Sequence, residues 1–109
     1  MNRMSDTFIY NKDVAAVEML PGIARKTLSY SENMMICQVR LAKGAVLPSH
    51  HHIHEHIISG SVRYTVGDEE RIVGAGDSVM IAADVPHAVV ALEDTLVIDV
   101  FSPMRPEYI

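Results

Sequence analysis

Residues 44–60 read GAVLPSHHHIHEHIISG and contain five of the six histidines of the chain. The histidines of this stretch are His50, His51, His52, His54 and His56, and the sixth is His87. Neutral imidazole is the commonest protein ligand of divalent transition metals. On a strand, alternate side chains share a face, so His50 and His52 would point together, about 6–7 Å apart. The stretch therefore predicts a metal site built on strands.

Other interpretations of the same stretch remain open. It could be a solvated histidine-rich loop, or it could be helical, with His52 and His56 as an i, i+4 ligand pair. Gly44 and Pro48 disfavour the helix. We expect His51 and His54 to be exposed or outside the ligand set, because they have the wrong parity or position for a shared inward site.

The sequence on either side of the histidines alternates between apolar and polar residues, as in half-buried strands. In 34–41 the residues of one face are Met35, Cys37, Val39 and Leu41. Similar short strands are predicted at 62–66, 71–73, 79–82, 88–92 and 95–101, separated by glycines, prolines and acidic turns. Only 13–20 has weak helical spacing. The pattern predicts an all-β fold, either a sandwich or a barrel.

The bulk composition narrows the class of protein. A length of 109 residues suits one domain. The net charge is −5, with no basic cluster, which argues against a nucleic-acid partner. No apolar run approaches the roughly 20 residues that span a membrane. The single cysteine, Cys37, reads as a core residue and fits a reducing compartment. We expect a cytoplasmic protein with a small-molecule ligand, no leader peptide and no membrane contact.

Two motifs resemble those of the cupin superfamily. The first is Gly44, five residues, His50-x-His52, a third ligand and then Gly60; the second is the Gly76-Asp77 turn followed by a short strand and Pro86-His87. The resemblance implies a double-stranded β-helix barrel, similar to a jelly roll. It also implies one divalent metal ion per chain, which could be Ni, Zn, Mn, Fe or Cu.

The ligand set that the cupin resemblance implies is His50, His52, His56 and His87. Glu55 is the competing candidate for the third position of the first motif. The interval between that position and Gly60 is shorter here than the family's usual spacing.

A narrower resemblance extends over nearly the whole chain. The stretches 22–30, 33–35 and 89–94 are similar to the KdgF-type pectin-degradation cupins, as is the ending Asp99-x-Phe101-x-x-x-Arg105. These cupins linearise 4,5-unsaturated uronates from pectin or alginate into open-chain keto-deoxy-uronates. The resemblance implies Asp99, Phe101 and Arg105 as catalytic residues and a sugar acid as substrate.

The residues themselves suit such a role. Asp99 shares a face with Val97 and Phe101, and burial of a carboxyl group raises its pKa toward a useful acid–base range. Arg105 has the planar fork that binds a carboxylate through two hydrogen bonds. The structural alternative is that Asp99 only accepts hydrogen bonds and that Arg105 forms a salt bridge in the tail.

Three further expectations complete the prediction. The alternatives to uronate chemistry are another metal-dependent enzyme, such as a dioxygenase or isomerase, and a non-catalytic cupin that binds a sugar acid. We expect one domain over 1–109, with a barrel core at about 24–101 and extensions at 1–23 and 102–109. We also expect a homodimer, because the apolar segment Thr7–Tyr10 is suited to pairing with a partner.

Overall fold

The computed structural model describes residues 4–49, 53–82 and 85–109. Within these ranges the chain forms strands and two short 3-10 helices. The elements are η1 (Asn11–Asp13), β1 (Val17–Leu20), β2 (Ile23–Tyr30), β3 (Met35–Leu41), β4 (Val46–Ser49), β5 (Ile53–Ser59), β6 (Ser61–Val66), β7 (Glu69–Gly74), β8 (Ser78–Ile81), β9 (His87–Ala91), β10 (Thr95–Phe101) and η2 (Pro106–Tyr108).

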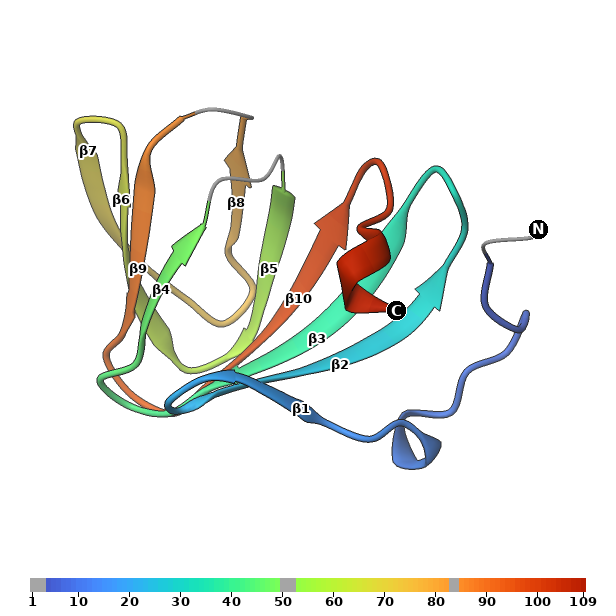
Figure 1. Cartoon of the computed structure of the whole chain (residues 1–109). Helices are drawn as coiled ribbons and strands as arrows, with labels where there is room; N and C mark the ends of the chain where they lie inside the picture. Colours follow the sequence, from blue (N-terminus) through green and yellow to red (C-terminus); the bar gives the residue numbers. More distant parts are fainter. Residues whose placement is uncertain (1–3, 50–52, 83–84) are drawn as a thin grey trace.

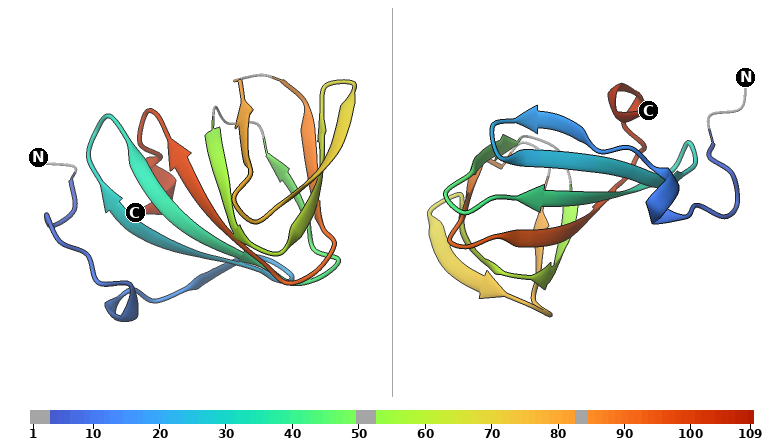
Figure 2. Two further views of the ribbon diagram at one scale, coloured as in Figure 1. Left: turned by 180° about the vertical axis from the view of Figure 1, so that it is seen from behind. Right: turned by 90° about the horizontal axis from the view of Figure 1, so that it is seen from below.

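The strands form two antiparallel sheets that face each other (Figure 1). The larger sheet has the order β1-β2-β3-β10-β5-β8, and the smaller has the order β4-β9-β6-β7. Neighbours within a sheet are often distant in sequence, as in a jelly roll: β10 pairs with both β3 and β5. The two sheets bend toward each other to enclose a common interior (Figure 2). The predicted all-β cupin barrel is confirmed.

The interior is filled by alternate residues of each strand. In β3 the buried residues are Met35, Cys37, Val39 and Leu41. In β10 they are Thr95, Val97, Asp99 and Phe101. Period-two alternation places one face of each strand against the core, so these two strands could be predicted with their correct faces. The smaller sheet adds Val62, Tyr64, Val89 and Ala91.

The helical spacing of residues 13–20 was misleading. The structure has a single 3-10 turn at Asn11–Asp13 and then β1, whose Glu18 pairs with Ala24 of β2. A weak local helical preference is overridden here by pairing with the edge of the sheet. None of the described helices is long and apolar enough to span a membrane.

Candidate functional site

A row of polar side chains crosses the inner face of the larger sheet. Asp99 of β10 lies in register with Cys37 of β3 on one side and with Glu55 of β5 on the other. Cys37 in turn lies opposite Thr27 of β2. Because residues in register on neighbouring antiparallel strands have Cβ atoms about 4.5–5.5 Å apart, the carboxyl groups of Asp99 and Glu55 are direct neighbours.

Both carboxyl groups are removed from solvent. Glu55 is 5% exposed and Asp99 is 4% exposed. Burial raises the pKa of Asp99 well above its ordinary 3.8, and the neighbouring Glu55 carboxyl raises it further through its charge and a hydrogen bond. Oδ1 of Asp99 finds no hydrogen-bond partner among the residues that the structure describes. The alternative that Asp99 serves only as a structural acceptor therefore has no support at this oxygen.

Tyr64 closes the row from the opposite sheet. Its side chain is buried, and burial, with the nearby Glu55 and Asp99, raises the pKa of its hydroxyl group. The hydroxyl oxygen has no hydrogen-bond partner in the described part of the chain. Burial also raises the pKa of the Cys37 thiol to about 11, so this cysteine stays protonated. The interpretation of Cys37 as a core residue without a nucleophilic role agrees with its burial.

The expectation that His56 faces the interior is wrong. His56 and His54 are exposed on the outer face of β5, whereas Ile53, Glu55 and Ile57 of the same strand are buried. The cause is the short interval before Gly60, where β5 turns into β6. Side chains on a strand alternate, so shortening a strand by any odd number of residues exchanges its two faces. Glu55, the competing candidate, takes the inward position.

Gly60 holds this turn in place. Its φ is +101°, and a Cβ atom here would lie 2.6 Å from the carbonyl oxygen of Asp94. Only glycine fits such a position without displacing the neighbouring backbone. The close approach to Asp94 therefore anchors the end of β5 and, with it, the inward face of Glu55.

Of the predicted metal ligands, His56 and His87 lie among the described residues, and His87 is the one that faces the interior. It begins β9, is 9% exposed, and lies in register with Ser49 and Val66. Its Nδ1 atom is 2.8 Å from the carbonyl oxygen of Val85. Because a carbonyl only accepts, Nδ1 carries a proton. A hydrogen bond of this kind to a backbone carbonyl orients the ring of a metal-ligating histidine.

The other predicted ligands, His50 and His52, lie outside the described residues. Within the ranges 4–49, 53–82 and 85–109, no group of three or more His, Cys, Asp or Glu side chains is arranged to hold a metal ion.

The C-terminal segment packs on the inner face of the larger sheet. The Thr27 hydroxyl donates to the carbonyl oxygen of Tyr108, and the Tyr108 ring meets Phe101 edge-on with centroids 5.5 Å apart. The guanidinium of Arg25 lies over the same ring, 4.2 Å from its centroid. These contacts bring Phe101 and the chain around Arg105 to the inner face that carries Asp99 (Figure 1).

Among the described residues, Arg105 forms no salt bridge of the kind considered above. Its side chain is half-buried, and its Nε has no hydrogen-bond partner in the part of the chain described. The ion pair found among the described side chains joins Arg63 to Glu70 on the opposite sheet. A half-buried guanidinium without a carboxylate is suited to binding an anionic ligand.

Three of these residues were not singled out from the sequence. In the predicted strand 62–66, Tyr64 shares a face with Val62 and Val66, and only its hydroxyl distinguishes it from them. Arg25 and Tyr108 come together through the fold of the tail, which no local pattern reveals. β2 reads IARKTLSY, so Arg25 stands beside a second charged residue, Lys26, and gives no separate signal.

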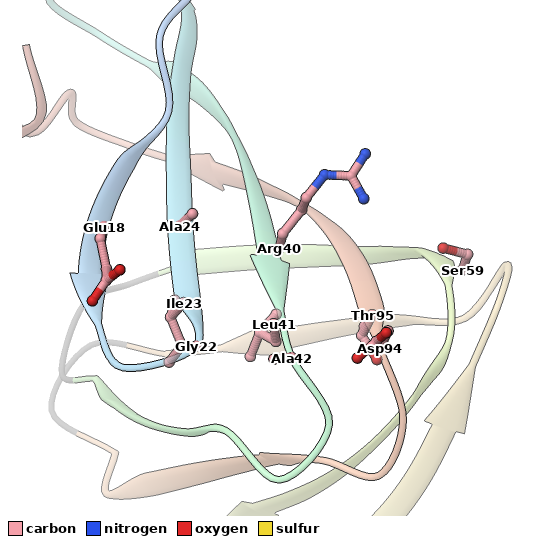
Figure 3. A pocket seen from close by; sticks show the side chains of 10 residues that line it. All are labelled: Glu18, Gly22, Ile23, Ala24, Arg40, Leu41, Ala42, Ser59, Asp94 and Thr95. Carbon is pink, nitrogen blue, oxygen red and sulfur yellow. The ribbon is translucent and has the colours of Figure 1, made fainter.

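Two of the pockets in the described part of the chain bear on the site. The first, about 430 Å³, lies at the end of the larger sheet where β2 and β10 begin, and it is bordered by Glu18, Arg40 and Asp94 (Figure 3). It shares no residue with the row of polar side chains. The Asp94 carboxylate already accepts a hydrogen bond from the Lys43 backbone N–H, so this group has a structural role.

The second pocket, about 310 Å³, lies between β6, β7 and β8. Its walls include Tyr64, Val66 and Val79. Val79 is the register partner of Glu55, and Val66 is that of His87. The pocket therefore borders the register partners of Glu55 and His87, at a volume near the lower limit of small-molecule sites, which span about 300–1,000 Å³.

Comparisons with known proteins agree with this geometry. The cupin-domain family profile matches residues 37–101. The pectin degradation protein KdgF of Dickeya dadantii is 36% identical over 97 residues, which cover 84% of this chain and 88% of that protein. The structure of KdgF from Halomonas sp. has a TM-score of 0.89 at 30% identity, covering 96% of this chain and 100% of that one. An RmlC-like cupin from Shewanella frigidimarina has a TM-score of 0.91 at 24% identity, covering 98% and 99% of the two chains, and supports the fold alone.

Proposed function

This chain belongs to the cupin-domain family and, within it, to the KdgF proteins, and on that basis we propose that it is a metal-dependent enzyme that linearises 4,5-unsaturated uronate monomers. The product is the open-chain keto-deoxy-uronate. The observation that carries the proposal is the buried Asp99 with its raised pKa, on the inner face shared with Phe101. A neutral carboxyl group in an apolar setting is suited to moving a proton on a bound sugar.

The proposed metal ligands are His50, His52 and His87. The hydrogen bond from His87 Nδ1 to Val85 supports this role, because it orients Nε2 as a donor to an ion. A bound divalent ion supplies a Lewis acid that stabilises negative charge developing on a ring oxygen. His56 is not part of the proposed set, because its side chain is exposed on the outer face of β5.

The remaining roles belong to side chains at the end of β10 and beyond. Arg105 binds the uronate carboxylate, as suggested by its half-buried guanidinium, whose Nε has no hydrogen-bond partner among the described residues. The Phe101 ring, buried beside Tyr108, forms an apolar wall that excludes water from Asp99. Asp99 moves the proton as the ring opens.

The test is an assay of purified, metal-analysed protein with a 4,5-unsaturated galacturonate monomer. Loss of the alkene absorbance is followed over time, and the product is identified by NMR. We expect turnover that a chelator abolishes and that Asp99→Asn lowers about 100-fold or more. Binding of the uronate without any product would refute an enzymatic role and favour a non-catalytic sugar-acid-binding cupin. An oxygen-dependent product would instead indicate a dioxygenase.

We propose further that the protein is a homodimer. The N-terminal segment that precedes β1 exposes two aromatic rings, with Phe8 77% and Tyr10 65% exposed. Large apolar side chains grouped on an exposed segment are typical of a contact with a partner.

A further inference from the structure

The buried position of Glu55 suggests a role beyond those assigned above. Its carboxyl group and that of Asp99 lie in register on β5 and β10, and both are at least 95% buried. No ion pair of either acid with an arginine or lysine is found among the described residues. Two adjacent carboxylates with no counterion are strongly disfavoured in a low-dielectric interior.

Among the described residues, the groups that interact with this pair are neutral. They are Cys37 of β3, Tyr64 of β6 and Tyr108 of η2. Arg25, a cation of β2, is directed to Thr27 and to the Tyr108 ring. A pair of acids in such surroundings keeps one proton, as in other carboxyl dyads.

The neighbours of the pair border open space. The wall of the 310 Å³ pocket includes Val79, which is the register partner of Glu55 on β8. It also includes Tyr64, whose hydroxyl group interacts with both acids. A sugar ring in this pocket would contact the residues next to the pair.

We propose that Glu55 is a second catalytic carboxyl group, and that Glu55 and Asp99 share one proton and transfer it between two atoms of the same sugar. This inference rests on the proposed uronate chemistry. In the resting pair Asp99 carries the proton and Glu55 is the carboxylate. The pair returns to that state after each turnover, so no other acid or base is consumed.

The proposed step is a balanced isomerisation. Glu55 takes the proton of the anomeric hydroxyl group, and the released electron pair forms the C1 carbonyl while the bond from C1 to the ring oxygen breaks. The ring oxygen becomes the oxygen of an enolate on C5. The enolate collapses to the C5 ketone as C4 takes the proton of Asp99. Transfer of the proton from Glu55 to Asp99 restores the pair, and nothing is oxidised or reduced.

The decisive variants are Glu55→Gln, Asp99→Asn and the double variant, each loaded with zinc. Glu93→Gln is the control, because Glu93 is an exposed acid in the turn before β10. We expect each single variant to lose about 100-fold or more in turnover, and the double variant to be no slower than the slower single one. The pH profile of the wild type should be bell-shaped and that of Glu55→Gln should lose its acidic limb, because that limb reports protonation of the base. Wild-type turnover and pH profile in Glu55→Gln would overturn the proposal.

Metal content separates this role from metal ligation. We expect Glu55→Gln to retain one zinc ion per chain by mass spectrometry of the metal. Loss of zinc in this variant would overturn the proposal, because Glu55 would then be a ligand.

A second measurement does not depend on uronate turnover. Carboxyl carbon NMR of zinc-loaded protein labelled at aspartate and glutamate reports which groups carry a proton. At neutral pH we expect a protonated Asp99 in the wild type, and a lower Asp99 pKa in Glu55→Gln, because the neighbouring charge is removed while the burial remains. If the wild type turns over no uronate, the proposed function fails, and the shared proton is then tested by this spectrum alone. An ionised Asp99 in the wild type would refute the shared proton, even if uronate turnover were found.

Discussion

Asp99 couples the stability of the protein to pH in an unusual direction for an aspartate. Its pKa in the folded state lies well above 3.8, so folding takes up a proton when the pH lies between the two values. The stabilisation is fully present below the unfolded pKa and is lost as the pH rises through the folded one. The loss reaches at most about 1.4 kcal/mol per pH unit.

Replacing Asp99 with asparagine should remove this dependence. We expect Asp99→Asn to raise the free energy of unfolding by about 2 kcal/mol relative to the wild type at pH 8, with a smaller difference at pH 4. Urea unfolding of zinc-loaded protein between pH 4 and pH 8 measures this difference in the free energy of unfolding. Asp68→Asn, in the exposed turn between β6 and β7, is the control. Parallel pH curves for wild type and Asp99→Asn would contradict the assignment.

The inward side chain of His87 and the outward side chain of His56 predict opposite effects on metal binding. His87→Ala should lower the metal content to less than about a tenth of an ion per chain, because it removes an inward donor whose orientation is set by Val85. His56→Ala should retain a full ion, since His56 is exposed on the outer face. Metal analysis after dialysis gives both values. Equal loss in the two variants would show that His56 faces inward in the metal-bound protein.

At the scale of single elements, the turn at Gly60 is the most constrained point. Gly60→Ala should cost about 3 kcal/mol or more, because its Cβ would clash with the Asp94 carbonyl and its φ is positive. Gly67→Ala also has a positive φ, but its Cβ would meet no atom within 4 Å, so we expect about 1 kcal/mol. Thermal and urea unfolding compare the two. A similar cost at both glycines would mean that the close contact at Gly60 relaxes freely.

The tail is a second element whose contribution can be isolated. Tyr108→Ala removes the edge-on contact with Phe101 and the contact with Arg25, and should lower the free energy of unfolding by about 2 kcal/mol. The adjacent Ile109 is 60% exposed, so Ile109→Ala should change it by less than about 0.5 kcal/mol. Equal effects would show that the tail does not pack on the sheet.

Most of the strands were predictable because their pattern is local. The inward faces of β3 and β10 follow from simple alternation, and β10 has the predicted bounds. β2 was not predicted, because all but one of its residues are only half-buried and its pattern does not alternate. The face of β5 could not be read from its own residues, because it is set by the close approach of Gly60 to β10.

The same contrast holds for the candidate site. Asp99 and His87 could be found from sequence, since each sits in a motif with defined spacing. The pairing of Asp99 with Glu55 depends on the register between strands 44 residues apart. Arg25 joins the inner face only when the tail folds back over β2. Such contacts between distant segments leave no periodic trace in the chain.

At the scale of the whole molecule, the proposed dimer is directly measurable. We expect light scattering at micromolar concentration to give twice the chain mass of 12.0 kDa. The double variant Phe8→Ser and Tyr10→Ser should shift the mass toward one chain, because both rings lie on the proposed contact. Ile72→Ser, at a residue 62% exposed on β7, is the matched control. A monomeric wild type would refute the dimer.

The register of β5 also bears on how this barrel could diverge among its descendants. Glu55 faces Asp99, while His54 and His56 face outward, and all three positions are counted back from the same turn. Insertion of a single codon between Glu55 and Gly60 would turn the histidines inward and the acid outward in one step. A lineage could thus exchange an acid-lined interior for a histidine-lined one without altering any existing residue. In this barrel, an insertion or deletion in β5 could therefore change the residues that line the interior in one step, whereas point substitutions would need several.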